Sequence, residues 1–284
     1  MRASSVLSEA WRNLISGTTR AALFALVFIA AVGALAWVDI RSVVGIVEGA
    51  AQFRAEGATV QVLKSDPNID GHRCDALSGT GALSTAGAVR QGTPIRILAM
   101  PASQITVMEA TPGLIAMLPT IAQPVQTTSD DQAGVWLSAD LATVLGASPG
   151  RVVQTSVGEA TVAGVYTWPD DGRARDLGYA VIAPVPADGA FSQCWAEIWP
   201  IDPNLQGLSY VSLSSSDPGV QATLGQLNTS LGTTFDATSL LSARLTRQAP
   251  LAGIVIGVVA GYVSVRILAW RSPPTSMPAF PVLI

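Results

Sequence analysis

The chain has 284 residues, of which 49% are hydrophobic and only 13% are charged, whereas soluble domains carry about 25% charged residues. The net charge of −4 is unevenly spread, because positions 39–249 hold 11 Lys and Arg against 19 Asp and Glu. This acidic middle argues against nucleic acid as a partner, and its length suits one folded domain or two small lobes.

Two apolar segments stand near the two ends of the chain. The first runs from Ala21 to Val38 without a charge, and the second, from Pro250 to Trp270, contains Arg266. Each is close to the roughly 20 residues that a helix needs to cross a bilayer. We therefore expect transmembrane helices at 21–38 and 250–270, with a domain at 39–249 held on one side of the membrane.

Arginines flank both apolar segments on the sides that face the chain termini. The positive-inside rule places such flanks in the cytoplasm, so we expect both termini inside and the central domain outside the plasma membrane. The scarcity of lysine (Lys64 alone) and the abundance of Ala, Val and Gly fit a GC-rich bacterial genome. The residues expected to anchor the chain at the membrane surfaces are Trp11, Arg20, Trp37, Arg266, Trp270 and Arg271. Arg266 is placed among them because it can snorkel to the interface, with a functional intramembrane charge as the alternative.

The segment 1–20 shows an amphipathic pattern. Apolar residues recur at helical spacing up to Ile15, and Arg2, Glu9 and Arg12 fill the other face. This pattern predicts a helix in the cytoplasmic membrane interface; a short solvated helix is the alternative. A cleaved signal peptide is a rival interpretation of the first span, since Ala34-Leu35-Ala36 fits a cleavage site. The apolar run, however, exceeds the usual length of about 7–15 residues.

Helical periodicity continues beyond the first span to Phe53 and predicts a stalk that ends at Gly57. The following residues 59–63 alternate as a strand, and the Pro- and Gly-rich stretch 65–86 indicates loops. Further patterns predict strands at 88–90, 95–100 and 105–109 and a short helix at 113–118.

The region 135–166 has the clearest pattern. A strand at 135–137 leads to a helix with Ser138 as N-cap and Gly146 as C-cap. Strands at 152–157 and 161–166 are expected to form a hairpin whose tight turn is 157–160. Later patterns predict strands at 179–183, 196–199 and 210–213, a helix opened by Asp217-Pro218, a second stalk at 238–247, and a short Pro-rich cytoplasmic tail at 271–284.

The two cysteines, Cys74 and Cys194, both fall in the middle segment. In an extracytoplasmic domain a disulfide between them is expected, with two buried free thiols as the alternative. Together with the lone His72 they fall short of a four-ligand metal site, so we expect no metal.

Catalytic patterns are equally sparse. Lys64 lacks the preceding glycine of a phosphate-binding loop, and His72 is the one histidine available to a nucleophile–base pair. The acidic pairs Asp130-Asp131 and Asp170-Asp171 are expected to be simply solvated. The sequence therefore predicts neither an enzyme nor a cofactor-binding protein.

Four runs stand in order along the chain: Glu9-Ala10-Trp11-Arg12-Asn13-Leu14, Val47-Glu48-Gly49-Ala50, Leu137 to Gly146, and Val157 to Val165. In this order they resemble the MacB/FtsX-like permease superfamily of ABC transport systems. The first run is similar to its elbow helix, the second to its stalk, and the last two together to its strand–helix–hairpin periplasmic core. The resemblance covers about 250 residues.

The resemblance implies an α+β extracytoplasmic domain between two transmembrane helices. It also implies a partner ATP-binding cassette subunit, and it leaves open a full-length permease or a second copy of this chain as a further partner. Family permeases have four spans, whereas two are present here, which leaves open an accessory subunit or a truncated permease. A membrane-anchored module that binds an envelope protein is the alternative of a different class.

Overall fold

The computed structural model describes residues 21–81, 83–122, 134–215 and 221–269, together with Ser8, Trp11 and Arg12. The chain divides into two compact units. One unit comprises 1–49 and 237–284 and is helical where it is described, and the other, 50–236, is the folded domain. Ser8, Trp11 and Arg12 are helical, but most of the expected elbow helix and the tail at 271–284 lie outside the described residues.

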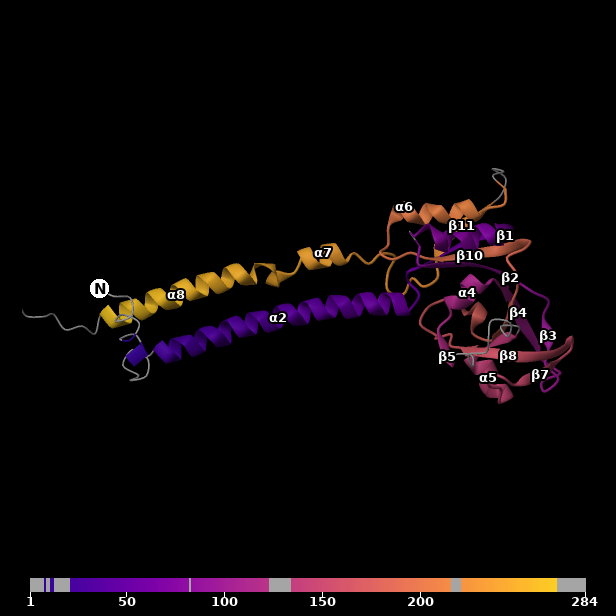
Figure 1. The fold of residues 1–284 in the computed structure, drawn as a ribbon, viewed down its shortest axis with the longest axis horizontal. Coiled ribbons are helices and arrows are strands. Elements are labelled where there is room, and N and C mark those ends of the chain that lie inside the picture. The colour runs from indigo at the N-terminus through magenta and orange to yellow at the C-terminus, as the bar shows by residue number, and fades with distance from the viewer. Residues whose placement is uncertain are drawn as a thin grey trace, which may run out of the picture. The chain divides into compact units, whose positions relative to one another are not determined.

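The helical unit holds two helices that are long and apolar enough to cross a membrane (Figure 1). Helix α2 (Ala21–Ala55) joins the first predicted span and its stalk in one continuous helix, as the periodicity predicts. Helix α8 (Ala249–Ala269) matches the second predicted span. The second stalk is not continuous: α7 (Ala237–Ser242) ends, and a 3-10 turn (Leu245–Gln248) precedes α8.

Within this unit α2 and α8 lie side by side and antiparallel (Figure 1). A Cβ atom on Gly257 would stand 3.3 Å from the Phe28 ring, and one on Gly253 would stand 4.0 Å from Val32. Near the other end of the pair, Arg244 Nη1 donates to Asp39 Oδ1 at 3.1 Å. Small residues at four-residue spacing allow such close helix packing in membranes.

The domain is built on one large mixed sheet with the strand order β11-β1-β10-β2-β4-β9-β6-β8-β5. The pairs β4–β9 and β6–β8 are parallel and the other pairs are antiparallel. β3 is added to β4 and β7 to β8. The strands are β1 (Val60–Asp70), β2 (Thr85–Gln91), β3 (Ile95–Arg96), β4 (Gln104–Ala110), β5 (Thr120–Ala122), β6 (Val135–Ser138), β7 (Val152–Thr155), β8 (Gly158–Tyr166), β9 (Ala180–Pro184), β10 (Ala190–Glu197) and β11 (Thr223–Gln226).

Short helices connect and cover these strands (Figure 1). They are α3 (Gly71–Ala76), α4 (Pro112–Ala116), α5 (Ala139–Leu145) and α6 (Pro203–Gln206), with 3-10 turns at Leu77–Thr80, Arg175–Leu177 and Gly207–Ser212. The α+β fold class predicted from the sequence is confirmed.

Alternation along the strands buries both faces of the sheet. Val62 and Met108 belong to one hydrophobic cluster. Leu63, the residue after Val62, belongs to a second cluster that contains the disulfide. Val107 belongs to a third cluster, formed with β6, β8, β9 and α5. The disulfide between Cys74 and Cys194 ties α3 to β10, so the predicted pairing is present.

The helix that the sequence predicts between Ser138 and Gly146 is confirmed, and so is the hairpin that follows it. Ser138 accepts a hydrogen bond from the Leu141 amide at the start of α5, and Gly146 ends the helix with a φ of 59°. The hairpin 152–166 forms, but its turn lies two residues earlier than the predicted turn at 157–160. Thr155 pairs with Gly158, which leaves Ser156 and Val157 as the turn.

Four other predictions were wrong. The stretch 65–86 is not mainly loop, because β1 extends to Asp70 and α3 follows. The strand predicted at 196–199 is β10, which begins at Ala190 and ends at Glu197. The strand predicted at 210–213 is largely a 3-10 turn, in which the Leu213 amide donates back to the Tyr210 carbonyl at 3.2 Å. Where a helix was predicted after Asp217, residues 223–226 form strand β11, because they pair with β1.

Candidate functional site

Hydrogen bonds of the backbone itself close the end of helix α2, which lies within the domain. The last residues of α2, from Ala50 on, belong to the domain unit. The Gly57 amide donates to the Arg54 carbonyl at 2.9 Å, and the Ala58 amide donates to the Phe53 carbonyl at 3.1 Å. This pair of bonds is a Schellman motif, which requires a left-handed residue, and Gly57 has a φ of 73°.

Side chains from distant segments satisfy the remaining carbonyls at this helix end. Asn228 Nδ2 donates to the Glu56 carbonyl at 3.0 Å, and Arg173 Nη2 donates to the Ala55 carbonyl at 3.4 Å. Gln226 Nε2 donates to the Ala58 carbonyl just beyond. Because a helix end carries partial negative charge, the Arg173 guanidinium is favourably placed there. We call this set of contacts the α2 clamp.

Arg173 is itself held in place. Its side chain is only 3% exposed, and it donates two hydrogen bonds to Asp171, from Nε to Oδ1 at 2.9 Å and from Nη2 to Oδ2 at 2.6 Å. Its guanidinium carbon lies 5.0 Å from the Trp168 ring centroid. Burial raises the pKa of the Asp171 carboxyl, but the hydrogen bonds and charge of Arg173 outweigh burial and bring this pKa below its usual value.

Aromatic rings surround the last turn of α2. Phe53 is 1% exposed, and its ring centroid lies 5.7 Å from that of Phe235, which lies 6.0 Å from Trp199. On the outer side, Arg54 pairs with Glu197 at 3.1 Å. Phe235 directly precedes Asp236 and α7, so these rings bring the end of α2 into contact with the segment that leads to α7.

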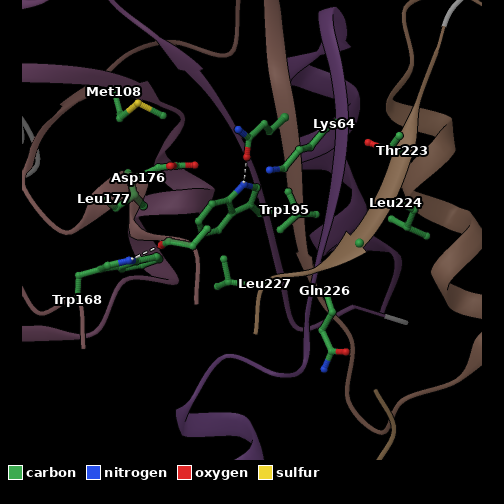
Figure 2. Close-up of a pocket in the computed structure, with 14 residues that line it drawn as sticks. Lys64, Met108, Trp168, Asp176, Leu177, Trp195, Thr223, Leu224, Gln226 and Leu227 are labelled. Atoms are coloured by element: carbon green, nitrogen blue, oxygen red, sulfur yellow. Dashed lines mark hydrogen bonds between the residues drawn. The ribbon is translucent and has the colours of Figure 1, made fainter. Parts of the chain in front are cut away.

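A pocket of about 290 Å³ lies beside the clamp (Figure 2). Val62, Trp195 and Gly225 are paired across three adjacent strands and contribute to its wall. The Trp168 and Trp195 ring centroids are 6.1 Å apart. The remaining lining residues come from β1, β4, β10, β11 and the loop after β8: Lys64, Met108, Ala174, Asp176, Leu177, Gln193, Thr223, Leu224, Gln226 and Leu227.

A second, wider pocket of about 780 Å³ shares Lys64, Met108, Asp176 and Gln193 with the first, so the two form one groove. Its lining is more polar and includes Arg90. The groove and the clamp are joined through the segment 168–177 and through Gln226, which contribute to both.

The sequence-predicted anchor residues are placed as follows. Trp37 is 59% exposed, with Arg41 over its ring at 5.0 Å, and Trp11 is exposed. Arg266 Nε donates to the Tyr262 hydroxyl at 3.0 Å. Arg20, Trp270 and Arg271 lie outside the described residues. The role of these residues at a membrane surface stays a prediction.

The structure also places the histidine and the acidic residues that the sequence analysis considered as catalytic or metal-binding candidates. His72 lies in helix α3, not in a loop, and bonds Asp188 at 2.9 Å on the surface. Asp171 is not simply solvated, because Arg173 pairs with it, whereas Asp170 pairs with Arg175 in the open. Among the described residues, no group of three or more His, Cys, Asp or Glu is placed to hold a metal ion.

The domain is similar in fold to extracytoplasmic domains of ABC-type transporters. The periplasmic region of MacB from Actinobacillus actinomycetemcomitans matches 61% of this chain and 91% of its own, with 10% identity and a TM-score of 0.45. The extracellular domain of the noncanonic ABC-type transporter YknZ from Gram-positive bacteria matches 60% of this chain and 100% of its own, with 13% identity and a TM-score of 0.41. No protein-family model and no curated protein matches the sequence.

Proposed function

We propose that this chain is a permease-like membrane subunit of an ABC-type transport or export system. Its two apolar helices cross the plasma membrane, both termini are cytoplasmic, and the domain within 39–249 is extracytoplasmic. An ATP-binding cassette subunit supplies the energy, and a full-length permease or a second copy of this chain completes the assembly. The chain moves its domain mechanically and carries out no nucleotide chemistry itself.

The α2 clamp is the observation that supports this proposal. A helix that only anchors a domain needs no more than a flexible linker at its end. Here the last turn of α2 is fixed by the Schellman motif, by the buried Phe53 and by the side chains of Arg173 and Asn228. A tilt or shift of α2 is therefore passed directly to the loop of Arg173 and to strand β11.

The composition supports the same membrane orientation and the assignment of nucleotide chemistry to a partner subunit. The arginine-flanked apolar segments predict the orientation, and Lys64 lacks the preceding glycine of a phosphate-binding loop. The contacts of Arg173 with Asp171 and with the Ala55 carbonyl hold the helix end to the loop of Arg173 without a covalent link.

Affinity purification of the tagged chain from its native membranes tests the partner. We expect an ATP-binding cassette subunit to be recovered in stoichiometric amounts. Hydrogen exchange in the segment 168–177 of the complex should change when a non-hydrolysable ATP analogue is added. This response should be lost in Arg173→Gln and kept in the neighbouring control Arg175→Gln. Recovery of neither an ATPase nor a permease subunit would contradict the proposal.

A further inference from the structure

We infer that the groove beside the α2 clamp binds an extended peptide segment of a partner protein. The peptide would place one large apolar side chain against the Trp168 and Trp195 rings and an acidic group beside Lys64 (Figure 2). This inference goes beyond the proposed function, because binding in the groove requires neither an ATPase nor movement of the helices.

The size and walls of the inner pocket select the apolar group. A volume of about 290 Å³ suits one large side chain, and the wider, more polar pocket beside it can take the neighbouring residues of a peptide. Both indole N–H groups are already used, since Trp195 Nε1 donates to Gln193 Oε1 at 2.9 Å and Trp168 Nε1 donates to the Ala174 carbonyl at 2.7 Å. The rings therefore present apolar faces to a ligand, which favours an aromatic or aliphatic group.

The charges along the groove select the rest of the ligand. Arg90 is neutralised by Glu109 at 2.6 Å, but Lys64 and Asp176 form no ion pair within the described part of the chain. Figure 2 shows them on either side of the Trp195 ring. Lys64 can bind a carboxylate, and Asp176 can accept from amide N–H groups. A peptide with an acidic residue supplies both a carboxylate for Lys64 and amide N–H groups for Asp176. A neutral sugar offers no anion to Lys64.

Gly225 gives a means of closing the inner pocket without disturbing the fold. A Cβ atom built on Gly225 meets nothing within 4 Å, and its φ lies outside the left-handed range. A leucine at this position would extend from β11 into the space beside Val62 and Trp195. Gly79 has equally open surroundings, in the 3-10 turn after α3, and does not line the groove. Gly79→Leu is therefore a matched control.

The test is calorimetric titration of the full-length protein in lipid nanodiscs with the blocked hexapeptide acetyl-Gly-Ser-Asp-Trp-Ser-Gly-amide. We expect binding to weaken about tenfold or more when Trp is replaced by Ala in the peptide, or when the protein carries Gly225→Leu. Gly79→Leu should bind like the unaltered chain. Lys64→Gln, at an exposed position, should remove the preference for this peptide over its Asp-to-Asn analogue.

Three results would overturn the inference. The first is equal binding of the Trp and Ala peptides. The second is unchanged binding by Gly225→Leu. The third is the absence of peptide binding while laurate or N,N′-diacetylchitobiose binds in a manner that Gly225→Leu abolishes, which would assign the groove to a lipid or a sugar. None of these outcomes depends on whether an ATPase co-purifies, so this inference and the proposed function can fail separately.

Discussion

Arg173 and Asp171 form a two-point ion pair at the end of helix α2, with donor–acceptor distances of 2.9 and 2.6 Å. Next to it in the sequence is a second pair, Arg175 with Asp170, whose side chains are 81% and 74% exposed. The first pair also bonds the Ala55 carbonyl, 118 positions earlier in the chain. This arrangement joins a surface loop to the last turn of a predicted transmembrane helix.

Replacing Arg173 by Met should destabilise the domain strongly. The substitution leaves Asp171 as a partly buried carboxylate without its partner, and it removes the donor to the Ala55 carbonyl. Breaking a buried pair in this way costs about 3–5 kcal/mol, which corresponds to a fall in Tm of roughly 6 °C or more for a domain of this size. Thermal unfolding of the full-length protein in detergent measures the change.

Arg175→Met is the control for this substitution. Its side chain is 81% exposed and that of Asp170 is 74% exposed, so solvent screens their interaction. The Tm of Arg175→Met should stay close to that of the unaltered chain. Equal effects of the two substitutions would mean that the α2 clamp does not hold the helix end.

The stability of the α2 clamp should depend on acid pH. The pKa of Asp171 is lower in the folded protein than in the unfolded chain, so the unfolded state binds this proton more readily. The stabilisation is complete above the unfolded value of about 3.9 and is lost as the pH falls through the folded value. Tm measured from pH 6 to pH 3 should fall more for the unaltered chain than for Asp171→Asn. A parallel fall in both would exclude Asp171 as the group responsible.

Contact between α2 and α8 should depend on Gly257. A Cβ atom there stands 3.3 Å from the Phe28 ring, whereas a Cβ atom at Gly261, one turn further along, meets nothing within 4 Å. In a chain with cysteines at Val32 and Gly253, copper-phenanthroline should form a cross-link, because those positions face one another. The yield should drop several-fold with Gly257→Leu and persist with Gly261→Leu. If Gly261→Leu lowers the yield equally, the helices do not pack through this face.

Removing the disulfide should destabilise the domain even though its core remains apolar. The bond joins residues 120 positions apart, and a closed loop of that length is worth about 4–5 kcal/mol in the chain-entropy model. The double variant Cys74→Ala/Cys194→Ala should therefore unfold at clearly lower urea concentration. A reductant should lower the midpoint of the unaltered chain and leave that of the double variant unchanged.

Elements encoded by neighbouring residues were predictable from the sequence. The cap residues Ser138 and Gly146 fix both ends of α5 by contacts within a few positions, and the apolar stretch from Ala21 onward is itself the signal for α2. Strand β11 was not predictable in this way. The spacing of Leu224, Leu227 and Leu231 fits a helical face equally well, and pairing with β1, some 160 positions earlier, decides the outcome.

The α2 clamp was missed for a related reason. In the sequence, Asp170 and Asp171 are equivalent members of a polar loop, and each has an arginine nearby. Only the tertiary position of Arg173, under Trp168 and against Ala55, makes one pair buried and leaves the other in solvent. The close packing of α2 and α8 did have a sequence signal, since Gly253, Gly257 and Gly261 recur at four-residue spacing.

Labelling of intact cells tests most directly that the domain lies outside the membrane and both termini lie inside. A cysteine at Ser103, on an exposed turn before β4, should react with a membrane-impermeant maleimide on intact cells. A cysteine at Ser8 should react only after the cells are permeabilised, and the unaltered chain should not react, because Cys74 and Cys194 are joined. Labelling at Ser8 but not at Ser103 on intact cells would contradict the account.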